Sequence, residues 1–288
     1  MAVVVAVPPC DHQARALAAR LGLPLIAPHV RRFPDGELHV RIDAELAGHD
    51  VVLVGAAHDF LPISFLAGTA RDLGARRVGL VAPYLAYLRQ DSRFHPGEGV
   101  TATYFGRLMS STVDWLVTVD PHLHRLAALD RVYSIPTTIA RAAPAIAAWV
   151  AASIEAPMLV GPDAESAQWV RAVAEACGAP HMILEKTRRG DRDVSVSAPE
   201  HALNGHTPVL VDDIVSTGKT LIEATRVLRA AGSAQPMCVA IHAVFADAAE
   251  AELVTAGARG IVTCDTIPHA TNRISVTGAI ADAVRGYL

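Results

Sequence analysis

The twelve residues VLVDDIVSTGKT, from 209 to 220, join an apolar run, a doubled acid and a small polar loop. Branched apolar residues surround the adjacent carboxylates of Asp212 and Asp213. A continuous apolar run is typical of a parallel strand that is covered on both faces. The loop at 216–220 then predicts a turn into a helix that begins near Gly218 or Lys219. We therefore expect a buried strand that ends at the two acids and is followed by a helix.

Open α/β sheets bind ligands at the carboxyl ends of their strands, where this loop is expected to lie. The N-terminus of a helix favours a phosphate, because its backbone N–H groups are unpaired and its dipole is positive. Gly218 lets the backbone approach closely, and Ser216, Thr217 and Thr220 add hydroxyl donors. The loop is not a Walker A motif, because no glycine lies five residues before Gly-Lys-Thr.

The acid pair indicates that the predicted phosphate ligand is a sugar phosphate. Two carboxylates beside a phosphate cradle suit a ligand with cis hydroxyls and a phosphate, and ribose 5-phosphate is the ligand that we predict. Asp212 and Asp213 would accept from its hydroxyls, and residues 216–220 would hold its phosphate. A cap on the following turn is the plainer alternative. It explains one acid but not two adjacent acids.

Composition and charge exclude several classes of protein. The chain has 288 residues, of which 51% are hydrophobic, so it is long enough for two domains with sizeable cores. The net charge of -4, with both signs interspersed, predicts no nucleic-acid or membrane partner. The most apolar stretch, 142–154, is shorter than the roughly 20 residues that a membrane span needs. The N-terminus lacks the basic lead of a secretory signal.

The 4 cysteines are scattered and form no Cys-x-x-Cys pair. Their spacing is not that of a zinc site or a disulfide framework, so we expect reduced thiols. Reduced thiols are typical of a cytoplasmic protein, and that is the location that we predict.

Short apolar runs alternate with Ala- and Leu-rich helical patterns along the whole chain. This alternation predicts an α/β fold with two domains, each a largely parallel sheet flanked by helices. We expect an N-terminal domain at 1–143 and a C-terminal domain at 144–273, with a last helix at 274–288 returning to the first domain. The strings LVAPY and LVGPD echo each other between the halves. Either an internal duplication or the general similarity of buried parallel strands explains the resemblance between these two strings.

The stretch at 209–220 resembles the phosphoribosyl-pyrophosphate loop that phosphoribosyltransferases share with ribose-phosphate pyrophosphokinases. The loop alone does not separate the two classes. The segment RRFPDGELHVRI at 31–42 favours the second class, because it resembles the Phe-Pro-Asp-Gly-Glu segment of its ATP site. The resemblance implies that Phe33 stacks on adenine, while Asp35 and Glu37 hold its amino group or the ribose. By residue pattern alone the segment is an ordinary hairpin.

Two further stretches resemble the same family. PYLAYLRQDSRFHPGEGVTA, at 83–102, is similar to its Arg-Gln-Asp loop, which implies that Arg89 and Gln90 reach ATP with Asp91 beside them. By composition this stretch is an ordinary charged loop. LEKTRRGDRDV, at 184–194, fits an acid-Lys-x-Arg sequence on a loop that closes over ATP. The resemblance implies that two of its residues stabilise the charge on the transferring group, namely Lys186 and Arg188.

The resemblance also implies a Mg²⁺ site. VTVDPHLH, at 117–124, is similar to the family's Asp-Leu-His stretch, with Pro121 where Leu is common. His122 would help to bind Mg²⁺, and Asp163, at the end of LVGPD, would be the second metal-associated side chain. By themselves these residues are weak evidence, because histidine is not the ligand that Mg²⁺ prefers.

Over nearly its whole length, the sequence resembles the compact form of this family. The resemblance implies two phosphoribosyltransferase-like domains, a homo-oligomer, and transfer of the β,γ-diphosphoryl group of ATP to the C1 hydroxyl of ribose 5-phosphate. Ser216 and Lys219 depart from it, because the kinases often carry an Asp and a small residue there. Two alternatives stay open, namely a phosphoribosyltransferase that consumes phosphoribosyl pyrophosphate and a non-catalytic regulatory paralogue.

Overall fold

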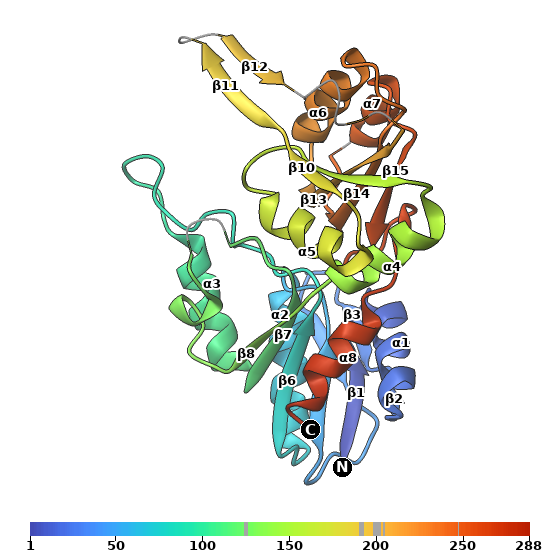
Figure 1. Ribbon diagram of the computed structural model, residues 1–288. Coiled ribbons are helices and arrows are strands. Elements are labelled where there is room, and N and C mark those ends of the chain that lie inside the picture. The colour runs from blue at the N-terminus through green and yellow to red at the C-terminus, as the bar shows by residue number, and fades with distance from the viewer. Residues whose placement is uncertain (124–125, 190–192, 198–202, 204, 247) are drawn as a thin grey trace. The chain divides into compact units, whose positions relative to one another are not determined.

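The computed structural model describes residues 1–123, 126–189, 193–197, 203, 205–246 and 248–288. The chain forms two compact units, one from residues 1–141 and 276–288 and the other from residues 142–275. Each unit holds a six-stranded sheet in which all neighbouring strands are parallel, with helices packed against it (Figure 1). The predicted α/β fold class is therefore confirmed.

Six apolar strands form the sheet of the first unit, and the four central ones are almost fully buried. The strands are Ala2–Ala6 (β1), Leu25–Ile26 (β2), Asp50–Val54 (β5), Arg77–Ala82 (β6), Trp115–Val119 (β7) and Thr137–Ala140 (β8). Their order in the sheet is β2-β1-β5-β6-β7-β8. Every residue of β5 and β7 is buried, as continuous apolar runs predict.

The helices of this unit pack in two pairs. They are Asp11–Leu21 (α1), Phe60–Asp72 (α2), Thr101–Thr112 (α3) and Thr277–Arg285 (α8), with a 3-10 turn at Leu129–Arg131. Helix α1 packs against α8, and α2 against α3. The strands His29–Arg32 (β3) and Leu38–Arg41 (β4) form a separate antiparallel hairpin, and β4 contacts α2.

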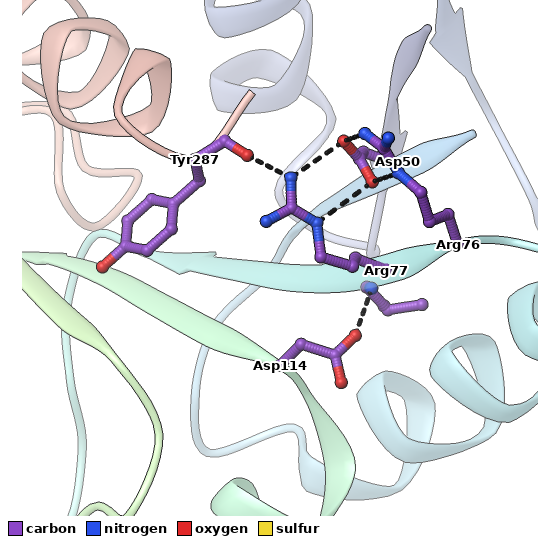
Figure 2. Close-up of polar contacts among 6 residues, drawn as sticks. Asp50, Arg76, Arg77, Asp114 and Tyr287 are labelled. Carbon is purple, nitrogen blue, oxygen red and sulfur yellow. Dashed lines mark hydrogen bonds and ion pairs between the residues drawn. The ribbon is translucent and has the colours of Figure 1, made fainter. Parts of the chain in front are cut away.

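A polar cluster holds the C-terminal segment to the first unit. Figure 2 shows the Arg77 guanidinium between the Asp50 carboxylate and the backbone carbonyl of Tyr287. Arg76 also donates to Asp50, with its Nε 2.9 Å from Oδ1. The hydrogen bond from Arg76 is the main cause that lowers the pKa of the Asp50 carboxyl to about 2. The Tyr287 ring stacks on Trp115 with 4.5 Å between centroids.

The second unit repeats this architecture. Its strands are Pro157–Gly161 (β9), His181–Ile183 (β10), Thr207–Val215 (β13), Met237–Ala243 (β14), Gly260–Cys264 (β15) and Asn272–Ile274 (β16). Their order is β10-β9-β13-β14-β15-β16. Its helices are Ala143–Ser153 (α4), Ala167–Cys177 (α5), Lys219–Ala230 (α6) and Ala249–Thr255 (α7).

The basic stretch that was expected to be a loop has regular backbone structure. Residues Glu185–Arg189 (β11) and Asp193–Ser197 (β12) pair as an antiparallel hairpin outside the six-stranded sheet. The prediction of a loop was therefore wrong for these residues. Composition indicated only a solvated segment, and antiparallel pairing is one way to satisfy its backbone groups. Across the described ranges no helix has the length and hydropathy of a membrane span, and all 4 cysteines are free.

Candidate active site

The two acids of the opening stretch lie on β13, not at its end. The strand runs on to Val215, so the prediction that it stops at Asp212 and Asp213 was wrong by two residues. The last pair between β13 and β9 is Leu210 with Val160, whereas β14 still pairs with Asp212 and with Val215. Because β14 continues to pair with it, β13 extends beyond the last residue that pairs with β9. The acids therefore lie where β13 has a strand neighbour on one side only.

Three carboxylates influence one another at this place. Asp213 is buried, with 5% of its surface exposed, and its backbone N–H donates to Asp212 Oδ1 at 3.0 Å. Burial raises the pKa of the Asp212 carboxyl well above its usual value, and the negative charges of Asp213 and Asp163 raise it further. A ligand that donates hydroxyl protons or brings positive charge would relieve this repulsion.

Asp163 is held rigidly after β9. Its Oδ1 accepts the backbone N–H groups of Glu165 and Ser166 at 3.1 and 3.3 Å, and Ser166 Oγ donates to the Asp163 carbonyl at 2.6 Å. The strand that leads to it ends at Gly161, where a Cβ would lie 2.6 Å from Ile183 Cδ1 and 2.7 Å from Ser166 Oγ. Only glycine fits there without displacing neighbours, and the turn delivers Asp163 towards the acid pair.

The loop after β13 enters α6 at the predicted place. Gly218 is the N-cap in the left-handed region, with φ 68°, and the helix begins at Lys219. A residue with a Cβ is strained in that region, so glycine is needed. No side chain caps the helix. In the described part of the chain, no protein group pairs with the hydroxyls of Ser216, Thr217 and Thr220. The loop therefore presents backbone and hydroxyl donors that an anion can use.

In the first unit, the residues expected to contact ATP lie in two places. Phe33, Asp35 and Glu37 occupy the tip between β3 and β4, where Phe33 N–H donates to the Glu37 carbonyl at 2.8 Å and Asp35 Oδ1 accepts Glu37 N–H at 3.0 Å. Phe33 is 36% exposed, and the Arg31 guanidinium lies over its ring, 4.4 Å from the centroid. The tip thus presents a partly exposed aromatic ring with a cation on one face.

The second place is the segment between β6 and α3. Arg89 is exposed, and Gln90 and Asp91 are half-buried. The Gln90 carbonyl accepts the N–H of Ala102 at 3.3 Å, which ties this segment to the start of α3.

The expected metal ligands come from different units. His122 is half-buried after β7 in the first unit, and Asp163 belongs to the second. The acid before His122 is engaged elsewhere, because Asp120, with φ 28°, accepts Arg141 Nη1 at 2.9 Å. His124 lies outside the described residues. Among the residues that are described, no three His, Cys, Asp or Glu side chains form a metal cluster.

Lys186 and Arg188 occupy alternate register positions on β11, opposite Val196 and Val194. The structure describes only the backbone there, so their roles stay predictions.

Sequence reasoning missed one polar network beside the loop. It joins the end of β15 to the start of β16 and comprises Thr263, His269, Thr271 and Asn272. The signal was available, because Asp-Thr-Ile-Pro-His-Ala-Thr follows an apolar strand just as the acids and the loop do.

The comparisons with known proteins cover nearly the whole chain. Residues 2–112 match the family model described as the N-terminal domain of ribose phosphate pyrophosphokinase, and residues 129–277 match the phosphoribosyl transferase domain. The chain is 35% identical to the ribose-phosphate pyrophosphokinase of Methanopyrus kandleri, across 94% of each protein. It is 33% identical to that of Thermoplasma acidophilum, across 95% of each.

A solved structure agrees in fold. The phosphoribosylpyrophosphate synthetase of Mycobacterium smegmatis superposes with a TM-score of 0.83 over 99% of this chain and 98% of that one, at 24% identity. The matching model of the N-terminal domain separates this chain from a phosphoribosyltransferase, which the opening loop alone did not. The chain belongs to the ribose-phosphate pyrophosphokinase family.

Proposed function

We propose that this protein transfers the β,γ-diphosphoryl group of ATP to the C1 hydroxyl of ribose 5-phosphate, so that 5-phosphoribosyl 1-pyrophosphate forms and AMP leaves. Relatives that carry the name ribose-phosphate pyrophosphokinase match across nearly their full length. The observation that carries the proposal for this chain is the juxtaposition of the crowded acids with the donor loop at the end of β13.

The pentose site follows from those two features. Asp212 and Asp213 accept hydrogen bonds from the 2- and 3-hydroxyls, which relieves the repulsion that, with burial, raises the pKa of Asp212. The backbone N–H groups at the start of α6 and the hydroxyls of residues 216–220 bind the 5-phosphate. Ribose 5-phosphate is thereby fixed at both ends, which orients its C1 hydroxyl for attack.

The lysines of this chain support the roles given to two site residues. Lys186 and Lys219 are the only lysines in the sequence, and every other cationic residue among the 25 Lys and Arg is an arginine. Lys219 stands at the first position of α6, where the helix dipole disfavours a cation. A phosphate bound at that place offsets this cost. We assign Lys219 to the 5-phosphate, and Lys186 with Arg188 to the charge that develops on the transferring group.

ATP is assigned to the residues of the first unit. The exposed Phe33 ring stacks on adenine, and Asp35 and Glu37 hold its amino group or the ribose. Arg89, with Gln90 and Asp91, reaches the phosphates, for which the forked guanidinium is suited.

Mg²⁺ is the cofactor that we propose. It takes hard oxygen ligands, keeps several waters and is usually shared with substrate phosphates. The donor chemistry fits, because Asp163 supplies a rigid carboxylate in the negative surroundings of Asp212 and Asp213. His122 is the second side chain that we assign to the ion. Bound there, Mg²⁺ neutralises charge on the phosphate oxygens.

A regulatory paralogue that binds nucleotide without turnover is the remaining alternative. The presence of both Lys186 and Arg188 favours the active enzyme. We also propose a homo-oligomer, in which the tip at 33–37 contributes to a neighbour's ATP site. The cytoplasmic location stays a prediction.

A phosphorus NMR time course with ATP, Mg²⁺ and ribose 5-phosphate tests the activity. We expect AMP together with a new pyrophosphate pair on a sugar, and no product when Mg²⁺ is omitted. Lys186→Ala should lower turnover about 10³-fold, whereas Arg171→Ala, an exposed position on α5, serves as the matched control with unchanged turnover. If ATP stays intact over hours with excess wild-type enzyme, the proposal fails.

The two lysines also permit a direct test of the assignments. Reductive ¹³C-methylation labels Lys186, Lys219 and the N-terminus alone, so few signals need assignment. Ribose 5-phosphate should shift the Lys219 signal and ATP the Lys186 signal. A shift of neither lysine on saturation would contradict both roles.

A further inference from the structure

Hydrogen bonds brace the segment between β15 and β16. Asn272 Nδ2 donates to Thr263 Oγ1 and to the Cys264 carbonyl, each at 2.8 Å. Thr263 Oγ1 lies 2.8 Å from Thr271 Oγ1, which lies 2.8 Å from His269 Nδ1. Asn272 Oδ1 accepts a hydrogen bond from the backbone N–H of His269 at 2.9 Å. Thr263 and Thr271 are buried, with 0% and 5% of their surfaces exposed, so the bond between their hydroxyls is shielded from water, whereas His269 and Asn272 are half-buried.

The donors and acceptors around Nδ1 indicate the tautomer of the neutral His269 imidazole. Its Nδ1 accepts the backbone N–H of Thr271 at 3.2 Å, so that nitrogen carries no proton. The Thr271 hydroxyl therefore donates to the same nitrogen, and the Thr263 hydroxyl donates to Thr271. The proton of the neutral imidazole is on Nε2. The network thus runs in one direction and ends at an imidazole with a single tautomer.

The imidazole contacts the segment that supports the phosphate-binding loop. The His269 and Phe245 rings are 4.5 Å apart between centroids, with 32° between their planes. The residues on either side of Phe245 hold the start of the loop, since Val244 N–H donates to the Val215 carbonyl at 3.0 Å and Ala246 N–H to the Ser216 carbonyl at 3.1 Å. Phe245 therefore links the imidazole to the backbone segment that holds the start of the loop.

We propose that His269 is a positioning residue for ribose 5-phosphate, which it affects through Phe245 and the loop at 216–220. It touches no reacting atom in this proposal. The inference rests on the proposed function only in that the loop binds the 5-phosphate. Its physical basis is that a phosphate cradle of backbone donors binds well only when those donors are held in place before binding.

Three substitutions separate the two contacts of the imidazole. His269→Asn keeps an acceptor near the position of Nδ1 but removes the ring. His269→Phe keeps a ring against Phe245 but removes the acceptor. His269→Ala removes both. His181→Ala is the matched control, because His181 is exposed at the start of β10 and no side-chain hydrogen bond of it is found in the described structure.

The measurements are steady-state kinetics and calorimetric binding of ribose 5-phosphate without ATP. In His269→Ala we expect the KM and Kd for ribose 5-phosphate to rise about tenfold, the size expected from losing one or two part-buried hydrogen bonds. The kcat and the KM for ATP should stay within about twofold, and His269→Asn should recover part of the loss. A merely structural role would instead lower the melting temperature with unchanged constants for ribose 5-phosphate.

Each outcome bears on one proposal or on both. Equal affinity of His269→Ala and wild type for ribose 5-phosphate overturns the inference, as does a loss confined to kcat. A wild type that binds ribose 5-phosphate but forms no AMP overturns the proposed function, while the binding comparison still tests His269. A wild type that binds no ribose 5-phosphate overturns both. Imidazole ¹⁵N shifts that place the proton on Nδ1 would contradict the direction of the network.

Discussion

Replacing Asp50 by Asn removes the negative charge at the centre of the cluster in Figure 2. The carboxylate is 3% exposed and accepts from both Arg76 and Arg77, and Arg77 in turn donates to the Tyr287 carbonyl. Asparagine fills the same volume but accepts through one oxygen only. The substitution therefore weakens the attachment of the C-terminal segment without creating a cavity.

The magnitude follows from the pKa of the carboxyl. The hydrogen bonds and charges of Arg76 and Arg77, with the Arg76 hydrogen bond the largest cause, lower that pKa from 3.8 to about 2 against the opposing effect of burial. A shift of this size corresponds to about 2.5 kcal/mol without screening. The two arginine side chains are 56% and 40% exposed, so water screens the pairing. We expect Asp50→Asn to lower the free energy of unfolding by about 1–1.5 kcal/mol at pH 7.

The sign of the pH dependence is fixed by the same shift. The folded-state pKa is below the usual value, so the stabilisation is present above pH 3.8 and is lost as the pH falls through about 2. The difference between wild type and Asp50→Asn should therefore be constant from pH 7 to about 5 and shrink steeply below about 4.

Urea unfolding followed by Trp115 fluorescence measures this difference. A background with Trp149→Phe and Trp169→Phe leaves Trp115, which stacks on Tyr287, as the only tryptophan. Asp282→Asn is the matched control, because Asp282 is 72% exposed and pairs with Arg285 on α8. It should change stability by less than about 0.5 kcal/mol. A difference for Asp50→Asn that persists undiminished at pH 2, or that is absent at pH 7, would refute the reasoning.

Three further substitutions test the second unit. Gly161→Ala should destabilise it by about 1–3 kcal/mol in urea, because the new Cβ would lie 2.6 Å from Ile183 Cδ1; unchanged stability would show that the neighbours yield freely. Gly218→Ala places a Cβ at φ 68°, at a cost of about 1–2 kcal/mol. The KM for ribose 5-phosphate should rise at least tenfold. An unchanged KM would exclude the loop from the phosphate site. Asp212→Asn should make the ligand-free protein more resistant to urea at pH 7 while weakening ribose 5-phosphate binding in calorimetry. The folded-state pKa of Asp212 is raised well above 3.8, so its ionised form destabilises the fold at neutral pH. The gain should shrink as the pH falls below the folded-state pKa and vanish only near the unfolded-state value of 3.8. A loss of stability at pH 7 would contradict the repulsion.

The local features of the pentose site were readable from the order of residue types. An apolar run, two acids and a Gly-containing polar loop predicted a buried strand that leads into a helix, and Gly218 and Lys219 stand at the start of α6 as expected. The alternation of such runs predicted two parallel sheets. These features depend on neighbours in sequence and on the periodicity of side chains, which a single chain displays directly.

The end of β13 was not readable in that way. The strand passes the acids because β14 lies beside it as far as Val215, and strand ends depend on the partner as much as on the segment itself. The hairpin of β11 and β12 was missed in part for the same reason, since the charged residues of β11 show no apolar alternation and pairing with β12 defines the strand. The Val-Ser alternation of Asp193–Ser197 was a strand signal that the interpretation of the segment as a loop overlooked.

By itself, the sequence determined the fold class, the family and the segments that carry the chemistry, because each is encoded in short runs of residue types. Tertiary structure alone decided which distant groups meet. In the folded chain, Asp163 lies close enough to raise the pKa of Asp212. Asp120 pairs with Arg141, and His269 packs against Phe245 beside the loop. These pairings join residues on different elements, and the close packing of those elements in the folded chain determines them.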